Sequence, residues 1–187
     1  NSLDKEDARL TEKQYKSFVR SGALLSDIDK EKMREVDREL SVLSPRFSKN
    51  VLNATNAFEL WIEDGKELDG LPESALIAAK ESAEAKGRDD AWLFTLQMPS
   101  FAPFIKYAKN RMLREKMFMA SQTKCTSGEF NNCENILEIT QLKFKKAQLL
   151  GFDTYADFIL ADRMAENIST VNKFMDDLFT PSIAAAK

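Results

Sequence analysis

The sequence predicts an all-α, mainly helical fold of several helices with a minor two-stranded β element near residues 57–62 and 91–96. Over most of the 187 residues, apolar side chains recur at the intervals of three and four that align them on one helical face. Only two short aromatic segments, bounded by charged and turn residues, break this pattern. We expect one helical unit over residues 1–187, with helices in 1–56, a small β/α insert in 57–97 and helices in 100–187.

Two apolar stripes predict the first helices. Tyr15, Phe18, Val19 and Gly22 share one helical face. A longer stripe with charged residues opposite it consists of Met33, Val36, Leu40, Leu43, Phe47 and Val51. Pro45 lies inside this second pattern and is expected to kink or divide the helix, because proline lacks the N–H that a helix interior uses.

The middle of the chain has a different pattern. Residues 57–62 and 91–96 are short and aromatic, which is typical of strands. Between them, "GLPESALIAAKESAEAKG" predicts a helix with Pro72 in its first turn and Gly87 after its end. Because two strands alone form a weak sheet, we expect this sheet to be a small insert in a helical body.

Helices return after residue 100. Ser100 is expected to cap a helix that has Pro103 in its first turn. Asn131, with Glu134 three residues later, resembles a capping box that opens the next helix. Apolar residues cover most of that helix, so we expect it to be buried between others. Its narrow polar stripe consists of Glu134, Glu138, Gln141, Lys145 and Gln148.

The stretch "QLLGFDTYADFILAD" at residues 148–162 joins two helices. Gly151 is expected in the left-handed position that ends the first, and Asp153 or Thr154 is expected to cap the second, with Asp157 completing a Thr-x-x-Asp box. The last segment is amphipathic through Val171, Phe174, Met175 and Leu178. It ends in an alanine run without a stop residue, so we expect a helix that continues in a longer protein.

Composition disfavours several partners. The chain has 27 Lys and Arg against 30 Asp and Glu, a net charge of −3, whereas nucleic acids and anionic membranes require a concentrated basic face. No apolar run is long enough to cross a bilayer, and the charged start is unlike a signal peptide. For Cys125 and Cys133 we predict free thiols that are buried or partly buried, with a disulfide across their short loop as the alternative.

The chain contains no histidine, which excludes His-Glu-x-x-His zinc sites and histidine-dependent serine or cysteine triads. Glycine-rich phosphate-binding loops are also absent from the sequence. Neighbouring carboxylates such as Asp89–Asp90 and Asp176–Asp177 are interpreted as solvated surface charge. The sequence therefore predicts no catalytic, cofactor-binding or metal-ligating residue in this chain.

A group of aromatic residues could line a peptide-binding groove, but helical spacing favours a place in the core. This group consists of Phe94, Phe101, Phe104, Tyr107 and Phe118. The same interpretation applies to Met112, Met117, Met119 and Met164.

Four phrases in a fixed order carry a resemblance to a known family. They are "SGALLSDIDKEKMREVDRELSVLSPRFSKNVLNAT", "ELDGLP", "WLFTLQMPSFAPFIKYAKNRMLREKMFMA" and "NNCENILEITQLKFKKAQLLGFDTYADFILADRMAEN". From about residue 10 onward the chain resembles the thimet oligopeptidase / peptidyl-dipeptidase family of zinc metallopeptidases, and within it the bacterial peptidyl-dipeptidases. Small departures occur at Asn131–Asn132, where Asp-Asn is expected, and at Leu142–Lys143, where Leu-Arg is expected.

The resemblance implies a large helical peptidase with a deep channel, whose His-Glu-x-x-His motif lies downstream of the matched region. This chain would be a non-catalytic segment of the N-terminal half that forms part of the channel wall, partnered by the C-terminal catalytic half. Zinc and short peptide substrates are expected in the full-length parent, and no cofactor in this chain. The alternative is a free-standing helical interaction module. The expected location is the cytoplasm, with the periplasm as the alternative.

Overall fold

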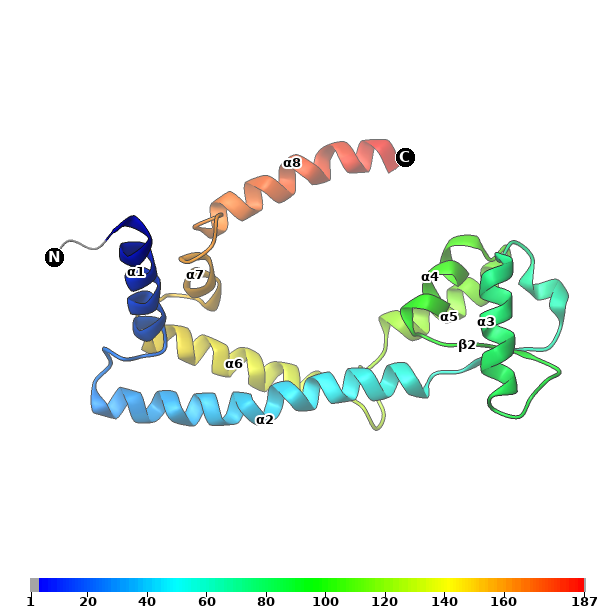
Figure 1. The fold of residues 1–187 in the computed structure, drawn as a ribbon, viewed down its shortest axis with the longest axis horizontal. Helices are drawn as coiled ribbons and strands as arrows, with labels where there is room; N and C mark the ends of the chain where they lie inside the picture. Colours follow the sequence, from blue (N-terminus) through cyan, green and yellow to red (C-terminus); the bar gives the residue numbers. More distant parts are fainter. Residues whose placement is uncertain (1–3, 187) are drawn as a thin grey trace. The chain divides into compact units, whose positions relative to one another are not determined.

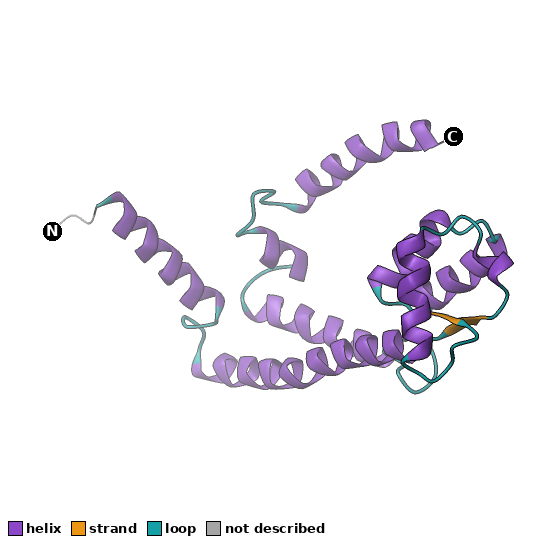
Figure 2. Ribbon diagram, turned by 45° about the vertical axis from the view of Figure 1, so that its right-hand side comes forward, coloured by secondary structure: helices purple, strands orange, loops and turns teal. Residues whose placement is uncertain are grey.

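A computed structural model describes residues 4–186, so residues 1–3 and 187 of the predicted ranges lie outside it. Within the described residues the chain is mainly helical with one small sheet, which confirms the predicted fold class (Figures 1 and 2). The elements are α1 (Lys5–Arg20), α2 (Asp27–Ala57), β1 (Leu60–Ile62), the 3₁₀ helix η1 (Gly65–Leu68), α3 (Glu73–Glu84), β2 (Trp92–Phe94), α4 (Met98–Tyr107), α5 (Arg111–Gln122), α6 (Cys133–Leu149), α7 (Tyr155–Leu160) and α8 (Ile168–Ala186).

The chain divides into two compact units. Unit 1 comprises the described residues of Asn1–Leu43 and Leu137–Lys187, and unit 2 comprises Ser44–Ile136. Helices α2 and α6 each contribute to both units. The predicted β/α insert of residues 57–97 lies within unit 2, while the single helical unit over residues 1–187 stays a prediction.

Unit 2 has a hydrophobic core around the two strands. β1 and β2 pair antiparallel, with Trp61 opposite Leu93. Phe94 of β2 and Phe104 of α4 are fully buried and meet edge to face, with ring centroids 4.7 Å apart. Helices α3, α4 and α5 surround this pair, so the small sheet is stabilised by helices as expected. The buried core residues are Leu60, Ile62, Leu68, Leu71, Ala79, Phe94, Leu96, Phe104, Ala108 and Met117.

Helix α4 begins earlier than predicted. Its N-cap is Gln97, and the proline of its first turn is Pro99; Pro103, which was predicted there, lies further inside the helix. The Ser100 hydroxyl accepts a hydrogen bond from the Thr95 backbone N–H at 3.0 Å. The predicted cap at Ser100 is therefore wrong, because the chain turns directly from β2 into the helix and Ser100 already lies within it.

The long apolar stripe of α2 is confirmed. Met33 and Val36 are buried, and the other members are at least half-buried. Helix α2 runs without interruption from Asp27 to Ala57, so Pro45 does not divide it. A single missing N–H removes one helical hydrogen bond, and the packing of the stripe on both sides outweighs that loss.

The α6–α7 junction has the predicted geometry. Gly151 has a φ of 82°, and the Thr154 hydroxyl accepts a hydrogen bond from the Asp157 N–H at 3.1 Å. Thr154 also donates to the Asp157 carboxylate at 2.6 Å. This junction directs the buried Phe158 against Phe152, with ring centroids 5.4 Å apart.

The start of α6 differs by one residue from the prediction. The Asn132 carbonyl accepts the Ile136 N–H at 2.8 Å, so Asn132 occupies the cap position predicted for Asn131. Asn131 instead accepts a hydrogen bond from the Cys133 N–H at 2.9 Å.

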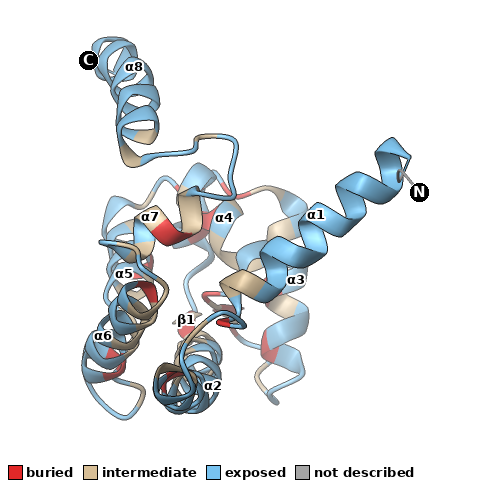
Figure 3. Cartoon of the chain, turned by 90° about the vertical axis from the view of Figure 1, so that its left-hand side faces the viewer, coloured by how far each residue is buried: buried red, intermediate tan, exposed pale blue. Residues whose placement is uncertain are grey.

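Helix α6 is not buried between others, which corrects the sequence-based expectation. Ile136, Leu137 and Phe144 are 47%, 63% and 45% exposed. Apolar residues extend over most of the helix surface, and its neighbours within the described residues leave part of that surface uncovered. Helices α1 and α8 are more exposed than α6, because neither has a buried residue (Figure 3).

Candidate functional site

A polar groove with a volume of about 750 Å³ lies in unit 1. Side chains from α1, α2, α6 and the region of α7 line it. Five of them are cationic and two are acidic. The lining residues are Arg9, Glu12, Lys13, Lys16, Ser17, Arg20, Ser21, Leu40, Lys146, Tyr155, Phe158 and Asp162.

Helix α1 supplies one wall of this groove. The Asp4 carboxylate accepts the Asp7 N–H at 2.8 Å and begins the helix. The cationic residues then follow at intervals of four, three and four, which places them on one face. They are Arg9, Lys13, Lys16 and Arg20.

The aromatic residues of α7 lie at the opposite wall of the groove. The Arg20 guanidinium lies 4.1 Å from the centroid of the Phe158 ring, which is the geometry of a cation–π contact. Tyr155 lies next to Phe158, and the Lys143 ammonium is 5.3 Å from the Tyr155 ring centroid. Both rings therefore already contact a cation of the chain.

Only part of the positive charge in the groove is neutralised. Lys16 pairs with Glu12 at 2.6 Å, and this hydrogen bond holds the pKa of the Glu12 carboxyl below its usual value. Lys146 pairs with Asp37 of α2 at 2.6 Å. For Arg9, Lys13 and Arg20, no carboxylate of residues 4–186 lies within ion-pair distance. The groove thus presents three cations that form no ion pair with a carboxylate of residues 4–186.

The ionic contacts of unit 2 connect its strands to the end of α3. Glu59 accepts hydrogen bonds from Lys86 and from the Trp61 indole, and these lower the pKa of its carboxyl. Arg88 pairs with Glu63 at 2.5 Å and Asp90 at 3.3 Å. The Arg88 guanidinium lowers the pKa of the Asp90 carboxyl. Of the neighbouring carboxylates Asp89 and Asp90, which were interpreted as solvated charge, Asp90 therefore forms an ion pair.

The predicted aromatic and methionine core is only partly confirmed. Phe94, Phe104 and Met117 are buried, and Phe101 packs against them. Five other residues are exposed; four lie on helices α4 and α5, and Met164 lies in the turn between α7 and α8. These are Tyr107 at 46%, Phe118 at 48%, Met112 at 80%, Met119 at 47% and Met164 at 102%.

The described residues contain no group of three or more acidic or cysteine side chains that could hold a metal ion. Cys125 and Cys133 are free thiols; Cys125 is partly buried as predicted, whereas Cys133 is exposed, which corrects the burial expected for it. Zinc in proteins requires thiolate, imidazole or carboxylate ligands gathered at one point. The residues described here do not fit such a site, and no reaction step through zinc can be assigned to them.

No helix within residues 4–186 is both long and apolar enough to cross a bilayer.

Comparison with known proteins indicates peptidases. Residues 104–187 match Peptidase family M3. Over 171 residues the chain is 42% identical to "Probable cytosolic oligopeptidase A" of Arabidopsis thaliana, an alignment that covers 88% of this chain and 24% of the relative. Oligopeptidase A of Haemophilus influenzae is 42% identical over 172 residues, 89% of this chain and 25% of the relative. Dipeptidyl carboxypeptidase of Escherichia coli is 32% identical over 177 residues, 94% of this chain and 26% of the relative.

These matches define the chain as a helical segment related to metallopeptidases. The comparisons support the thimet oligopeptidase family, as the ordered phrases of the sequence predicted. It spans about a quarter of the length of the curated relatives it matches. Identity is higher with the two oligopeptidase A proteins than with the dipeptidyl carboxypeptidase, so the finer place beside the bacterial peptidyl-dipeptidases stays a prediction.

Proposed function

We propose that this chain is a non-catalytic segment of a larger zinc peptidase that cleaves short peptides, and that it forms part of the wall of the substrate channel. The observation that carries the proposal is the uncovered apolar face of α8. Phe174, Met175 and Phe179 are 62%, 57% and 64% exposed. Their spacing of one, four and five residues gathers them on one side of the helix, with Leu178 between them.

An apolar face of this extent is unusual on a monomer surface and typically packs against another surface. We infer that the remainder of the peptidase covers it. The relatives extend well beyond the aligned region, and the corresponding part of the parent protein could supply the residues that cover this face. The catalytic groups and the zinc ligands would then come from that remainder, because this chain has no histidine.

The proposal is tested first by hydrolysis. The purified chain, supplied with zinc and a quenched fluorescent peptide, is expected to show no chelator-sensitive cleavage. Specific cleavage that a chelator stops would contradict the non-catalytic role.

Reconstitution provides the positive test. Oligopeptidase A of Haemophilus influenzae would be produced without its aligned segment and mixed with this chain. Peptidase activity is expected only in the mixture, and Phe174→Ser with Phe179→Ser should abolish it by removing apolar contacts. Lys173→Ser with Asp176→Ser is the matched control, since both residues are exposed on the polar side of the same helix. Failure of every mixture would instead favour a free-standing interaction module.

The location in the cytoplasm is also proposed. It is supported by the Arabidopsis thaliana relative, whose name describes it as cytosolic. Fractionation of cells that express the parent protein would test it, and recovery in the periplasmic fraction would contradict it.

A further inference from the structure

Five cationic side chains line the groove of unit 1, and the proposed peptidase role gives these side chains no function. We propose that it binds an acidic peptide segment, through the Arg9, Lys13 and Arg20 side chains of α1. This inference does not depend on the proposed function, because every residue that lines the groove belongs to unit 1 of the chain itself.

Charge is the first argument. The chain as a whole is acidic, with a net charge of −3, whereas the groove has five cations and two carboxylates. A concave surface concentrates this potential and favours an anionic ligand. Glu12 is neutralised by Lys16, which leaves Asp162 as the acidic side chain of the groove without an ion pair in residues 4–186.

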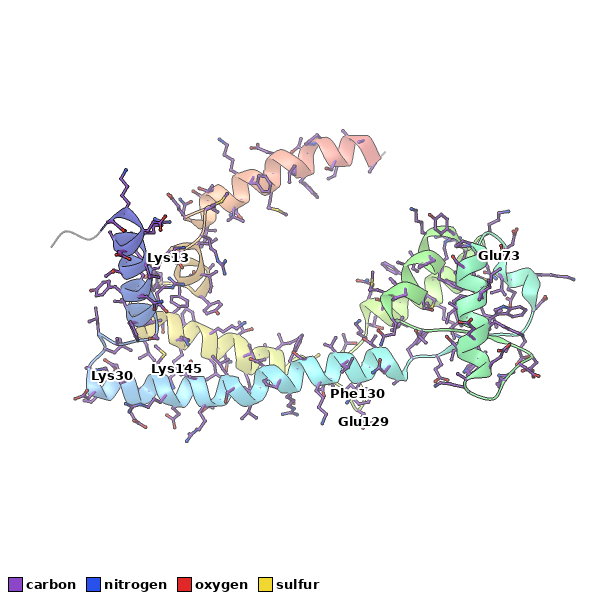
Figure 4. The ribbon with its side chains drawn as sticks, viewed as in Figure 1. Lys13, Lys30, Glu73, Glu129, Phe130 and Lys145 are labelled. Carbon is purple, nitrogen blue, oxygen red and sulfur yellow. The ribbon has the colours of Figure 1, made fainter. Side chains whose placement is uncertain are left out.

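The donor chemistry matches carboxylates. Two of the three available cations are arginines, whose planar guanidinium can bind a carboxylate with two parallel hydrogen bonds. Lys13 lies between them on α1, one helical turn from Arg9, and is labelled in Figure 4. The hydroxyls of Ser17 and Tyr155 line the same groove and can donate to peptide carbonyls.

The aromatic residues argue against nucleic acid as the ligand. Single-stranded nucleic acids bind by stacking their bases on exposed aromatic faces. Phe158 is only 7% exposed and contacts Arg20 and Phe152, while Tyr155 is contacted by Lys143. Phe158 is therefore too buried to stack on a base, and Tyr155 already contacts a cation of the chain, so the groove is poorly suited to base stacking.

The volume is sufficient for a short peptide. At about 750 Å³ the groove lies within the range of roughly 300–1,000 Å³ that ligand sites in proteins occupy. An extended acidic segment would place successive carboxylates near Arg9, Lys13 and Arg20, which follow each other along α1.

Fluorescence anisotropy with the full chain tests the proposal. The probe is a labelled, end-capped Glu-Glu-Phe-Glu-Glu peptide, and the reference is the corresponding Gln-Gln-Phe-Gln-Gln peptide. We expect the acidic probe to bind at least about tenfold more tightly than the reference, and raised salt to weaken it. Equal affinity for both peptides would overturn the proposal.

Two variants are expected to change the affinity for the acidic peptide in opposite directions. Arg9→Gln with Lys13→Gln should weaken the acidic probe about tenfold or more, whereas Asp162→Asn should strengthen its binding by removing a repelling charge. Arg46→Gln with Lys49→Gln is the matched control. It makes the same charge change at exposed positions of α2 outside the groove.

Equal losses in the two double variants would show a nonspecific charge effect and overturn the site. Tighter binding of a thymidine oligonucleotide of the same charge would overturn the choice of ligand. Neither result would affect the reconstitution of peptidase activity, so the two proposals fail independently.

Discussion

Gly70 joins η1 to α3 in a conformation that only glycine adopts readily. Its φ is 91°, and a Cβ atom there would collide with the Tyr107 carbonyl oxygen. We expect Gly70→Ala to lower the free energy of unfolding by about 3 kcal/mol, from backbone strain of about 1–3 kcal/mol and the clash together. Gly87 has a φ of 80° but open space around its Cβ position, so Gly87→Ala should lose only the strain. Urea denaturation of both variants measures the difference, and equal losses would contradict the role of the Tyr107 carbonyl.

Asn132 connects residues of unit 2 that are distant in sequence. It is buried, accepts a hydrogen bond from the Asn50 amide at 2.9 Å and donates to the Phe47 carbonyl at 3.1 Å. Asn132→Leu should lower the free energy of unfolding by about 2–4 kcal/mol, because it leaves partly buried polar partners without hydrogen bonds. Asn131→Ala removes only the exposed contact to Cys133 and should cost about 1 kcal/mol. Thermal unfolding of the two variants tests this order, and a larger loss from Asn131→Ala would reverse it.

At the scale of elements, Glu59 links β1 to the end of α3. Its pKa is lowered in the folded state by Lys86 and Trp61, so the stabilisation is present above the usual carboxyl pKa and is lost as the pH falls through the lowered value. Glu59→Gln should therefore lower the free energy of unfolding by about 1 kcal/mol near neutral pH and by less at about pH 3, where the carboxyl is increasingly protonated. Glu84→Gln on α3 is the control, with no ion pair seen in the described residues. Urea denaturation at both pH values measures the effect, and an equal loss at the two values would contradict it.

The sequence predicts where helices lie better than it predicts which of their faces are buried. Local signals were sufficient for the α6–α7 junction, since Gly151, Thr154 and Asp157 act within a few residues of one another. Burial of α6 could not be predicted in this way, because periodicity identifies an apolar face without identifying what covers it. Phe144 illustrates the difference, at 45% exposure on a helix expected to be enclosed.

The groove of unit 1 also combines a feature that is local in sequence with contacts that only the fold creates. Its α1 wall is visible in the sequence as four cations at intervals of four, three and four, a signal not used in predicting partners. Lys146 and Tyr155 lie more than a hundred residues further along, and only the fold brings them to the same surface. A net charge of −3 conceals such a local concentration of positive charge.

At the scale of the whole molecule, the two units differ in the core that stabilises them. All ten residues of the main hydrophobic cluster belong to unit 2, whereas the buried apolar residues of unit 1 are Met33, Val36, Ala147 and Phe158. Since burial of apolar surface is the dominant stabilising contribution, unit 1 should unfold at lower denaturant concentration than unit 2.

The tryptophans allow this difference to be measured. Trp61 and Trp92 both lie in the sheet of unit 2, so tryptophan fluorescence reports that unit, while far-UV circular dichroism reports helices of both. We expect the dichroism transition to begin at lower urea concentration than the fluorescence transition, and coincident curves would contradict independent unfolding.

Phe104→Ala should lower the free energy of unfolding measured by tryptophan fluorescence by about 3–5 kcal/mol, because it empties the centre of the unit 2 core. Phe158→Ala should shift only the early part of the dichroism curve, since Phe158 packs within unit 1.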